Sequence, residues 1–210
     1  MKLYELGPTR SIRARWMLQE LGIDFEAVPV NLPAGEHRGA EFRAINPAGK
    51  IPVLVDEGWV LTESVAIVLY LAEKHPERGL LPVDLRERAD AYRWMLFAVT
   101  ELEQPLWRIA RHTNLYPPEE RLPADVTLAQ REFRAMAAVL ERHMSGREFV
   151  AGDAMSAADI IVAYTLDWGQ TYDLLEHCPQ LRVYLERMYA RPAAPRRIGE
   201  LLRELRAAAR

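Results

Sequence analysis

The chain has 210 residues, half of them apolar and 27% of them charged, with a formal net charge of −3. A domain usually spans about 100–200 residues, so this length predicts one large domain or two small ones. The near balance of 27 basic and 30 acidic residues gives no reason to expect a nucleic-acid partner. The first residues turn polar too early for a signal peptide, and no apolar run is long enough for a transmembrane helix. The single cysteine, Cys178, excludes an internal disulfide, so we expect a cytoplasmic protein with no membrane partner.

The first eighty residues alternate strand and helix patterns. Strands are predicted over Lys2–Leu6 and Phe25–Val30, and a hairpin over Pro52–Val55 and Trp59–Leu61. Helices are predicted over Ser11–Leu21, Ala40–Ile45 and Glu63–Lys74. Strands that are separated by helical crossovers pair in parallel, and the terminal hairpin adds an antiparallel part. We therefore expect an α/β domain over residues 1–79.

After a linker rich in Pro and Gly, from His75 to Pro82, strand patterns cease. Amphipathic helices are predicted from Asp84 to Tyr116 and over Asp125–Met144, Ala157–Leu166, Pro179–Ala190 and Pro195–Ala208. Pro105 should kink or break the first of them. The pairs Asp84…Glu87 and Ser156…Asp159 have capping spacing, and the helix after Ser156 is apolar on nearly every side, which predicts a central, buried helix. The second half is expected to be an all-helical domain over residues 85–210.

Two hydroxyl residues, Thr9 and Ser11, lie between the first strand and the first helix. Ligands of open α/β sheets bind beyond the carboxyl ends of strands, and a helix N-terminus favours an anion there. A hydroxyl that donates to a bound thiolate lowers the pKa of the thiol from about 8.5 toward neutrality. The alternative is that Thr9 or Ser11 only caps the helix, which is the commoner role of such residues.

The segment Asn46–Leu54 contains a turn followed by Ile51-Pro52 at the start of a strand. If Pro52 is cis, Ile51 would expose its backbone N–H and C=O at a sheet edge, where a peptide ligand could pair with them. A trans proline that starts an edge strand is an equal alternative.

Glu63 and Ser64 stand at the start of an apolar helix. The Ser64 hydroxyl and the free helix N–H groups suit a carboxylate, while the Glu63 side chain suits an ammonium group. Together they could hold both charged groups of an amino acid. The alternative is an ordinary helix N-terminus, in which acidic and hydroxyl residues are common.

The remaining reactive residues carry weaker signals. The five histidines have no metal-ligand spacing, so no metal is expected, although His37 in a polar loop could reach a ligand. No C-x-x-C motif occurs, which excludes dithiol chemistry by the chain alone, and Cys178 reads as a buried thiol. Four residues of the helical half are candidates for the wall of a substrate pocket, although core or surface roles are favoured for each: Arg108, His112, Tyr116 and Trp168.

Taken together, these motifs resemble the cytosolic glutathione transferase superfamily along essentially the whole chain. The opening Met1–Tyr4 and the run Ser11–Leu18 resemble bacterial members. The segment Asn46-Pro47…Ile51-Pro52 matches the cis-proline turn of the family. Glu63-Ser64, followed by Ala66-Ile67, matches its γ-glutamyl site, and Phe149–Ile160 resembles its capping motif. The resemblance implies a thioredoxin-like N-terminal domain, an all-α C-terminal domain and an active site between them.

The resemblance also assigns roles to individual residues. Ile51, presented by cis-Pro52, would pair with the cysteinyl backbone of glutathione, and Glu63 and Ser64 would hold its γ-glutamyl group. His37 and Lys50 would lie near its glycyl end. Tyrosine-type members have a tyrosine where this chain has Glu5, and cysteine-type members have a cysteine where it has Arg10. This leaves a serine- or threonine-type member, with Thr9 as the first candidate for the activating hydroxyl and Ser11 as the second.

The implied function is a glutathione S-transferase that conjugates the glutathione thiolate to a small hydrophobic electrophile, acts without a metal and forms a homodimer. Pro8-Thr9 also resembles a bacterial class with glutathione-dependent disulfide reductase activity, which is the first alternative. A non-catalytic interaction protein on the same fold is the second.

Overall fold

The computed structural model describes residues 1–208 and divides into two compact units. Met1–Leu81 form the first unit together with the C-terminal segment that begins at Arg191, and Pro82–Ala190 form the second. The predicted helical domain over residues 85–210 includes this last segment, whereas the structure groups it with the first unit. Within residues 1–208, no helix is both long and apolar enough to cross a membrane.

The first unit contains a sheet of four strands in the order β2-β1-β3-β4. The strands are β1 (Lys2–Glu5), β2 (Glu26–Pro29), β3 (Val53–Asp56) and β4 (Trp59–Thr62). β1 pairs with β2 in parallel, while β3 is antiparallel to both β1 and β4. The predicted combination of a crossover and a terminal hairpin is confirmed. β3 is an interior strand, so the edge position that we expected for the Pro52 segment is wrong.

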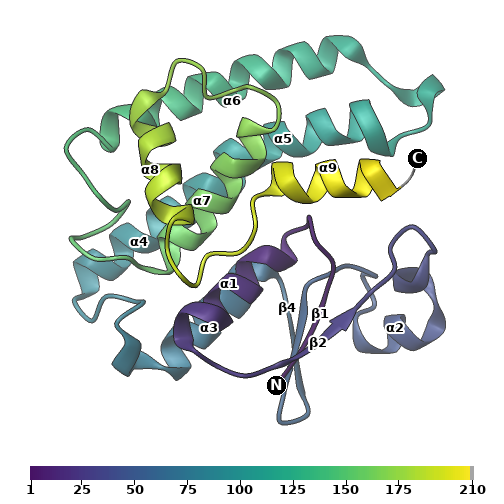
Figure 1. Ribbon diagram of the computed structural model, residues 1–210, viewed down its shortest axis with the longest axis horizontal. Helices are drawn as coiled ribbons and strands as arrows, with labels where there is room; N and C mark the ends of the chain where they lie inside the picture. Colours follow the sequence, from purple (N-terminus) through teal and green to yellow (C-terminus); the bar gives the residue numbers. More distant parts are fainter. Residues whose placement is uncertain (209–210) are drawn as a thin grey trace. The chain divides into compact units, whose positions relative to one another are not determined.

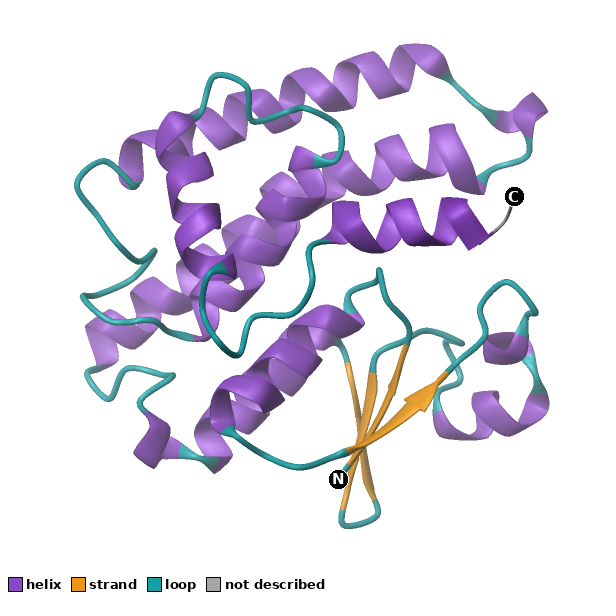
Figure 2. Ribbon diagram, viewed as in Figure 1, coloured by secondary structure: helices purple, strands orange, loops and turns teal. Residues whose placement is uncertain are grey.

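Helices cover both faces of this sheet. α1 (Ser11–Leu21) and α3 (Ser64–Lys74) pack together on one face, and α2 (Ala40–Ile45) lies on the other (Figures 1 and 2). Phe42 of α2 packs with Val30 and Val53 in a small buried cluster. The 3₁₀ turns η1 (Glu36–Arg38) and η2 (Pro76–Arg78) precede α2 and follow α3, and α9 (Ile198–Ala208) ends the unit.

The second unit is entirely helical in its secondary structure. It contains α4 (Leu85–Phe97), α5 (Glu103–Ala110), α6 (Pro123–His143), α7 (Ala157–Gln170) and α8 (Pro179–Tyr189). α4 and α5 are joined by the π-helical turn η3 (Ala98–Leu102), α5 continues into a second one, η4 (Arg111–Leu115), and η5 (Pro118–Glu120) is a 3₁₀ turn. Pro105 therefore does not break the helix. A proline has no N–H to donate to the carbonyl one turn earlier in the helix. The wider π-helical turn η3, which precedes Pro105, accommodates this missing hydrogen bond.

The predicted caps are confirmed. The Asp84 carboxylate accepts the backbone N–H groups of Arg86 and Glu87 at the start of α4. Ser156 and Asp159 form a capping box at the start of α7, and nearly all of α7 is buried, as its apolar composition predicted.

Gly169 of α7 lies against the ring of Phe133 on α6. A methyl group on Gly169 would lie 2.5 Å from Cζ of Phe133, which is fully buried. The rigid ring has no room to move away, so Gly169→Ala is expected to lower the free energy of unfolding by about 1–3 kcal/mol. Urea denaturation measures this, with Gly199→Ala as the control because a methyl group there meets no atom within 4 Å. Equal stability of the two variants would contradict the prediction.

Candidate functional site

Three of the predicted segments meet at one end of the sheet. Tyr4 of β1 pairs with Val53 of β3, and Val53 pairs with Thr62 of β4, so these residues form one row across the sheet. The chain leaves this row toward Thr9 after β1 and toward Glu63-Ser64 after β4, and it enters the row from Ile51-Pro52 before β3. The strand register thus gathers residues that are up to 55 positions apart at the same end of the first unit.

Thr9 and Ser11 form a pair of hydroxyls at the start of α1. The Thr9 Oγ1 lies 2.9 Å from the Ser11 Oγ, and it also lies 2.5 Å from the carbonyl oxygen of Leu6. Neither residue is the N-cap of α1, since Arg10 holds that position, although the Thr9 Oγ1 accepts the Ser11 N–H. Ser11 is only 1% exposed, whereas Thr9 is half-buried. Thr9 is therefore the more exposed of the two residues.

The bond between Ile51 and Pro52 is cis, as one of the two alternatives predicted. Both ladders of β3 begin at Val53, so the backbone of Ile51 lies just outside the paired region. The side chain of Ile51 packs against the cluster of Val30 and Phe42. Its backbone is therefore held at the end of an interior strand rather than along an edge strand.

The turn before Ile51 lies against the loop that contains His37. Buried Asn46 holds this turn, because its amide donates to the carbonyl of Lys50 at 2.7 Å and its Oδ1 accepts the Ala48 N–H at 3.1 Å. Gly49 has φ of +61°, and a methyl group there would lie 2.8 Å from the His37 carbonyl oxygen. Only glycine satisfies both conditions. The close approach of Gly49 to the His37 carbonyl places His37 beside this turn. The turn leads into Lys50, which is exposed, and then into Ile51.

Glu63 and Ser64 form a tight entry into α3. Glu63 has φ of +66° and ψ of 112°, a conformation that is costly for a residue with a side chain. Its side chain is exposed, while Ser64, the first residue of α3, is 5% exposed. Strained backbone of this kind concentrates at ligand sites.

Arg13 lies beside Ser64 of the predicted site, and the sequence alone did not point to it. It is 1% exposed, and its Nη1 donates to the Oγ of Ser64 at 3.2 Å, which links α1 to the start of α3. The available signal was its spacing, since Arg13 lies three and four residues before Trp16 and Met17, both fully buried. A charged residue on the buried stripe of a helix indicates a buried partner.

The C-terminal segment lies against α1 and against Gly7, which precedes it. The guanidinium of Arg191 forms a two-point ion pair with Glu20 of α1, at 2.7 and 2.8 Å. Farther along, Leu201 of α9 lies 3.3 Å from where a methyl group on Gly7 would be. These contacts explain why the segment belongs to the first unit. The sequence carries no local signal for them because the partners are about 170–190 residues apart.

The residues proposed for a pocket wall have partners within the second unit. Arg108 binds Asp125 and Glu132, and His112 Nε2 lies 3.3 Å from Asp125. Tyr116 stacks edge-on against His112, and Trp168 meets Trp107 edge-on with ring centres 6.3 Å apart. Arg108 of α5 and His112 of η4 thus connect these segments to α6. Cys178 is buried, and burial raises the pKa of its thiol, as expected for an unreactive cysteine.

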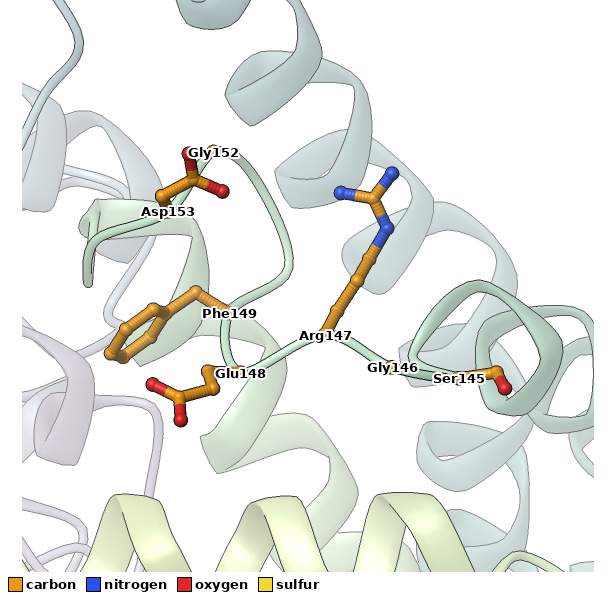
Figure 3. Close-up of a pocket in the computed structure, with 7 residues that line it drawn as sticks. All are labelled: Ser145, Gly146, Arg147, Glu148, Phe149, Gly152 and Asp153. Carbon is orange, nitrogen blue, oxygen red and sulfur yellow. The ribbon is translucent and has the colours of Figure 1, made fainter.

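The second unit contains a hollow of about 500 Å³ in the loop between α6 and α7 (Figure 3). None of the eight predicted site residues lines this hollow. Its lining consists of polar residues, two glycines and one aromatic residue: Ser145, Gly146, Arg147, Glu148, Phe149, Gly152 and Asp153. Among residues 1–208, no group of three or more His, Cys, Asp or Glu side chains could hold a metal ion.

Comparison with known proteins identifies the family. Residues 1–73 match the glutathione S-transferase N-terminal domain, and residues 106–192 match the glutathione S-transferase C-terminal domain. The chain belongs to the glutathione S-transferase family. It is therefore an enzyme of that family, with the thioredoxin-like first domain and helical second domain that we expected.

Individual relatives agree with this membership. The chain is 31% identical to glutathione S-transferase GstA of Escherichia coli O157:H7, over 91% of this chain and 94% of that protein. A sphingomonad glutathione S-transferase, solved in complex with glutathione, is 30% identical with a TM-score of 0.81, covering 92% of this chain and 95% of the other. A glutathione transferase of Burkholderia graminis, solved with two glutathione molecules per subunit, is 26% identical with a TM-score of 0.83, covering 92% and 85%.

Proposed function

We propose that the chain binds glutathione at the end of the sheet where Thr9, Ile51 and Ser64 converge. The observation that carries the proposal is the row formed by Tyr4, Val53 and Thr62, because it gathers the three motifs in one place. Ile51 offers backbone groups to the cysteinyl residue of the ligand by strand pairing. Ser64 and Glu63 hold the γ-glutamyl group, and His37 and Lys50 lie on the side of its glycyl end.

The two hydroxyls act as a pair in this proposal. The Thr9 hydroxyl has a single proton, so it donates one hydrogen bond at a time. When no ligand is bound, the acceptor is the Leu6 carbonyl oxygen or the Ser11 Oγ. When a thiolate is present, the Thr9 proton turns toward the sulfur, and Ser11 donates to the Thr9 oxygen in its place. Hydrogen bonding to the charged form lowers the pKa of the thiol. Thr9 is thus the catalytic residue, and buried Ser11 supports it.

The reaction is conjugation of this thiolate to a small hydrophobic electrophile. The sulfur lone pair forms the new carbon–sulfur bond, and the leaving group departs with its bonding electrons. The chain contributes a site that lowers the pKa of the thiol and positions the sulfur, which are the two contributions that this reaction needs. A homodimeric state and a cytoplasmic location belong to the same proposal.

Glutathione-dependent disulfide reduction is the second candidate. The glutathione transferase of Burkholderia graminis was solved with two glutathione molecules in each subunit, and disulfide reduction uses two thiols. In that reaction the first glutathione thiolate attacks a disulfide and releases one thiol as a mixed disulfide forms. A second glutathione thiolate then attacks the mixed disulfide, which gives oxidised glutathione and releases the second thiol. No cysteine of the chain takes part.

Isothermal calorimetry with glutathione tests the proposal. We expect saturable binding with a dissociation constant between about 1 μM and 1 mM, the usual range of Michaelis constants. S-methylglutathione should bind but not react, which separates binding from chemistry. Turnover of an aryl halide, an epoxide and a mixed disulfide then separates the two candidate reactions. If millimolar glutathione produces no heat of binding, the proposed function is wrong.

A further inference from the structure

Arg13 places a buried positive charge directly behind the predicted γ-glutamyl site. Its side chain is 1% exposed and reaches from α1 to the Oγ of Ser64, at 3.2 Å. Ser64 is the first residue of α3, so its side chain lies beside the free backbone N–H groups of the helix N-terminus. A guanidinium and a helix N-terminus therefore contribute positive potential to the same place.

The direction of this hydrogen bond determines what Ser64 can do. A guanidinium has only donors, so it must donate to the serine oxygen. With one lone pair of Ser64 used in this way, the hydroxyl proton remains to donate to a ligand, together with a second lone pair that can accept. Because the guanidinium and the helix N-terminus beside Ser64 are positive, donation by Ser64 to a carboxylate is favoured over acceptance from an ammonium group.

We propose that Arg13 is a positioning residue that makes this site specific for a ligand carboxylate, by holding Ser64 as a donor and adding positive charge behind it. The inference rests on the proposed function, in which that carboxylate is the α-carboxylate of the γ-glutamyl group. Arg13 acts through Ser64 and does not touch the reacting sulfur.

A ligand that differs only in the carboxylate tests the inference. Calorimetry with glutathione and with its decarboxylated analogue, γ-aminobutyryl-cysteinylglycine, gives the preference for the carboxylate as a ratio of dissociation constants. In Arg13→Met this preference should fall by roughly tenfold, because a charge-assisted donor no longer orients the serine. Arg13→Lys, which retains the charge but not the planar geometry, should lie between the wild type and Arg13→Met.

A double variant tests whether Arg13 acts through Ser64. If it does, Arg13→Met should reduce the preference much less in a Ser64→Ala background than in the wild type. Arg15→Met is the matched control, since Arg15 lies on the same helix but binds Glu5, with 2.9 Å between Nε and Oε2. It should leave the preference unchanged.

The possible results distinguish the inferred role of Arg13 from the proposed glutathione-binding function. Circular dichroism identifies the variants that fold, and Arg13→Lys carries the test if Arg13→Met does not. Equal losses of affinity for both ligands in a folded Arg13 variant would mean a purely structural role and would overturn the inference. Failure of the wild type to bind glutathione would instead overturn the proposed function.

Discussion

Replacing Thr9 with Val is expected to lower kcat/KM for glutathione conjugation by roughly ten- to a hundredfold near neutral pH. Valine has the shape of threonine but no hydroxyl, so the thiolate loses one charge-assisted hydrogen bond, worth about 1.5–3 kcal/mol. The pH profile of kcat/KM should also shift, because the pKa of the bound thiol rises toward about 8.5. Stopped-flow detection of the thiolate absorbance measures that pKa directly.

Matched variants distinguish the roles of the two hydroxyls. Thr9→Ser keeps the hydroxyl and should retain most of the activity. Ser11→Ala should have a smaller effect than Thr9→Val, since Ser11 is 1% exposed and, in the proposed arrangement, acts on the sulfur only through Thr9. If Ser11→Ala abolished activity while Thr9→Val left it intact, the assignment of Thr9 as the catalytic residue would be wrong.

The second large effect is expected at Asp159, the fully buried carboxylate of the capping box. Its Oδ1 accepts from the Val150 N–H at 2.9 Å and from the Tyr184 hydroxyl at 3.0 Å. Its Oδ2 accepts from the Ser156 N–H at 2.8 Å. Asp159→Asn replaces one acceptor oxygen with an amide donor that faces these donors. We expect a loss of at least about 3 kcal/mol in the free energy of unfolding, because buried donors lose their acceptor.

Denaturation in urea measures this loss. Asp153→Asn is the control, because Asp153 is an exposed acid in the neighbouring loop and its substitution should change stability by less than about 0.5 kcal/mol. A similar stability of the two variants would show that the capping box contributes little.

The contribution of Asp159 to the free energy of unfolding should also depend on pH. Burial raises its pKa from 3.8 to about 6, although four hydrogen bonds to the carboxylate oppose that shift. Since the pKa is higher in the folded state, the stabilising contribution is complete below the unfolded value of 3.8 and is lost as the pH rises through about 6. The stability gap between wild type and Asp159→Asn should therefore be wider at pH 5 than at pH 8, by about 1 kcal/mol. A gap that widens toward pH 8 would have the opposite sign and would contradict this assignment.

Much of the fold could be predicted because its signals are local. The bounds of α1 and α2 agree with the prediction at both ends, and α1 ends where Gly22 adopts the left-handed conformation at φ of +66°. The capping pairs were readable for the same reason, since cap and partner lie three residues apart. In contrast, α7 continues to Gln170, four residues beyond the predicted end at Leu166. Its last turn is stabilised by packing, for which the local sequence carries no marker.

The candidate site was partly predictable. The motifs around Thr9, Ile51 and Ser64 were identifiable individually, but each had an ordinary structural explanation until the strand register placed them at one end of the sheet. Arg13 was missed because the sequence shows only an arginine in a helix, and its role depends on a partner 51 positions away.

By itself, the sequence determined the order of secondary structure, the two-part composition and the absence of any cysteine from the first half of the chain. These features depend on neighbouring residues and on composition, so they can be read without a fold. The tertiary structure alone decided that β3 is interior, that Ser11 is buried while Thr9 is only half-buried, and that the segment from Arg191 belongs to the first unit. Each of these depends on contacts between residues distant in the chain, and burial and pairing are set by the packed fold.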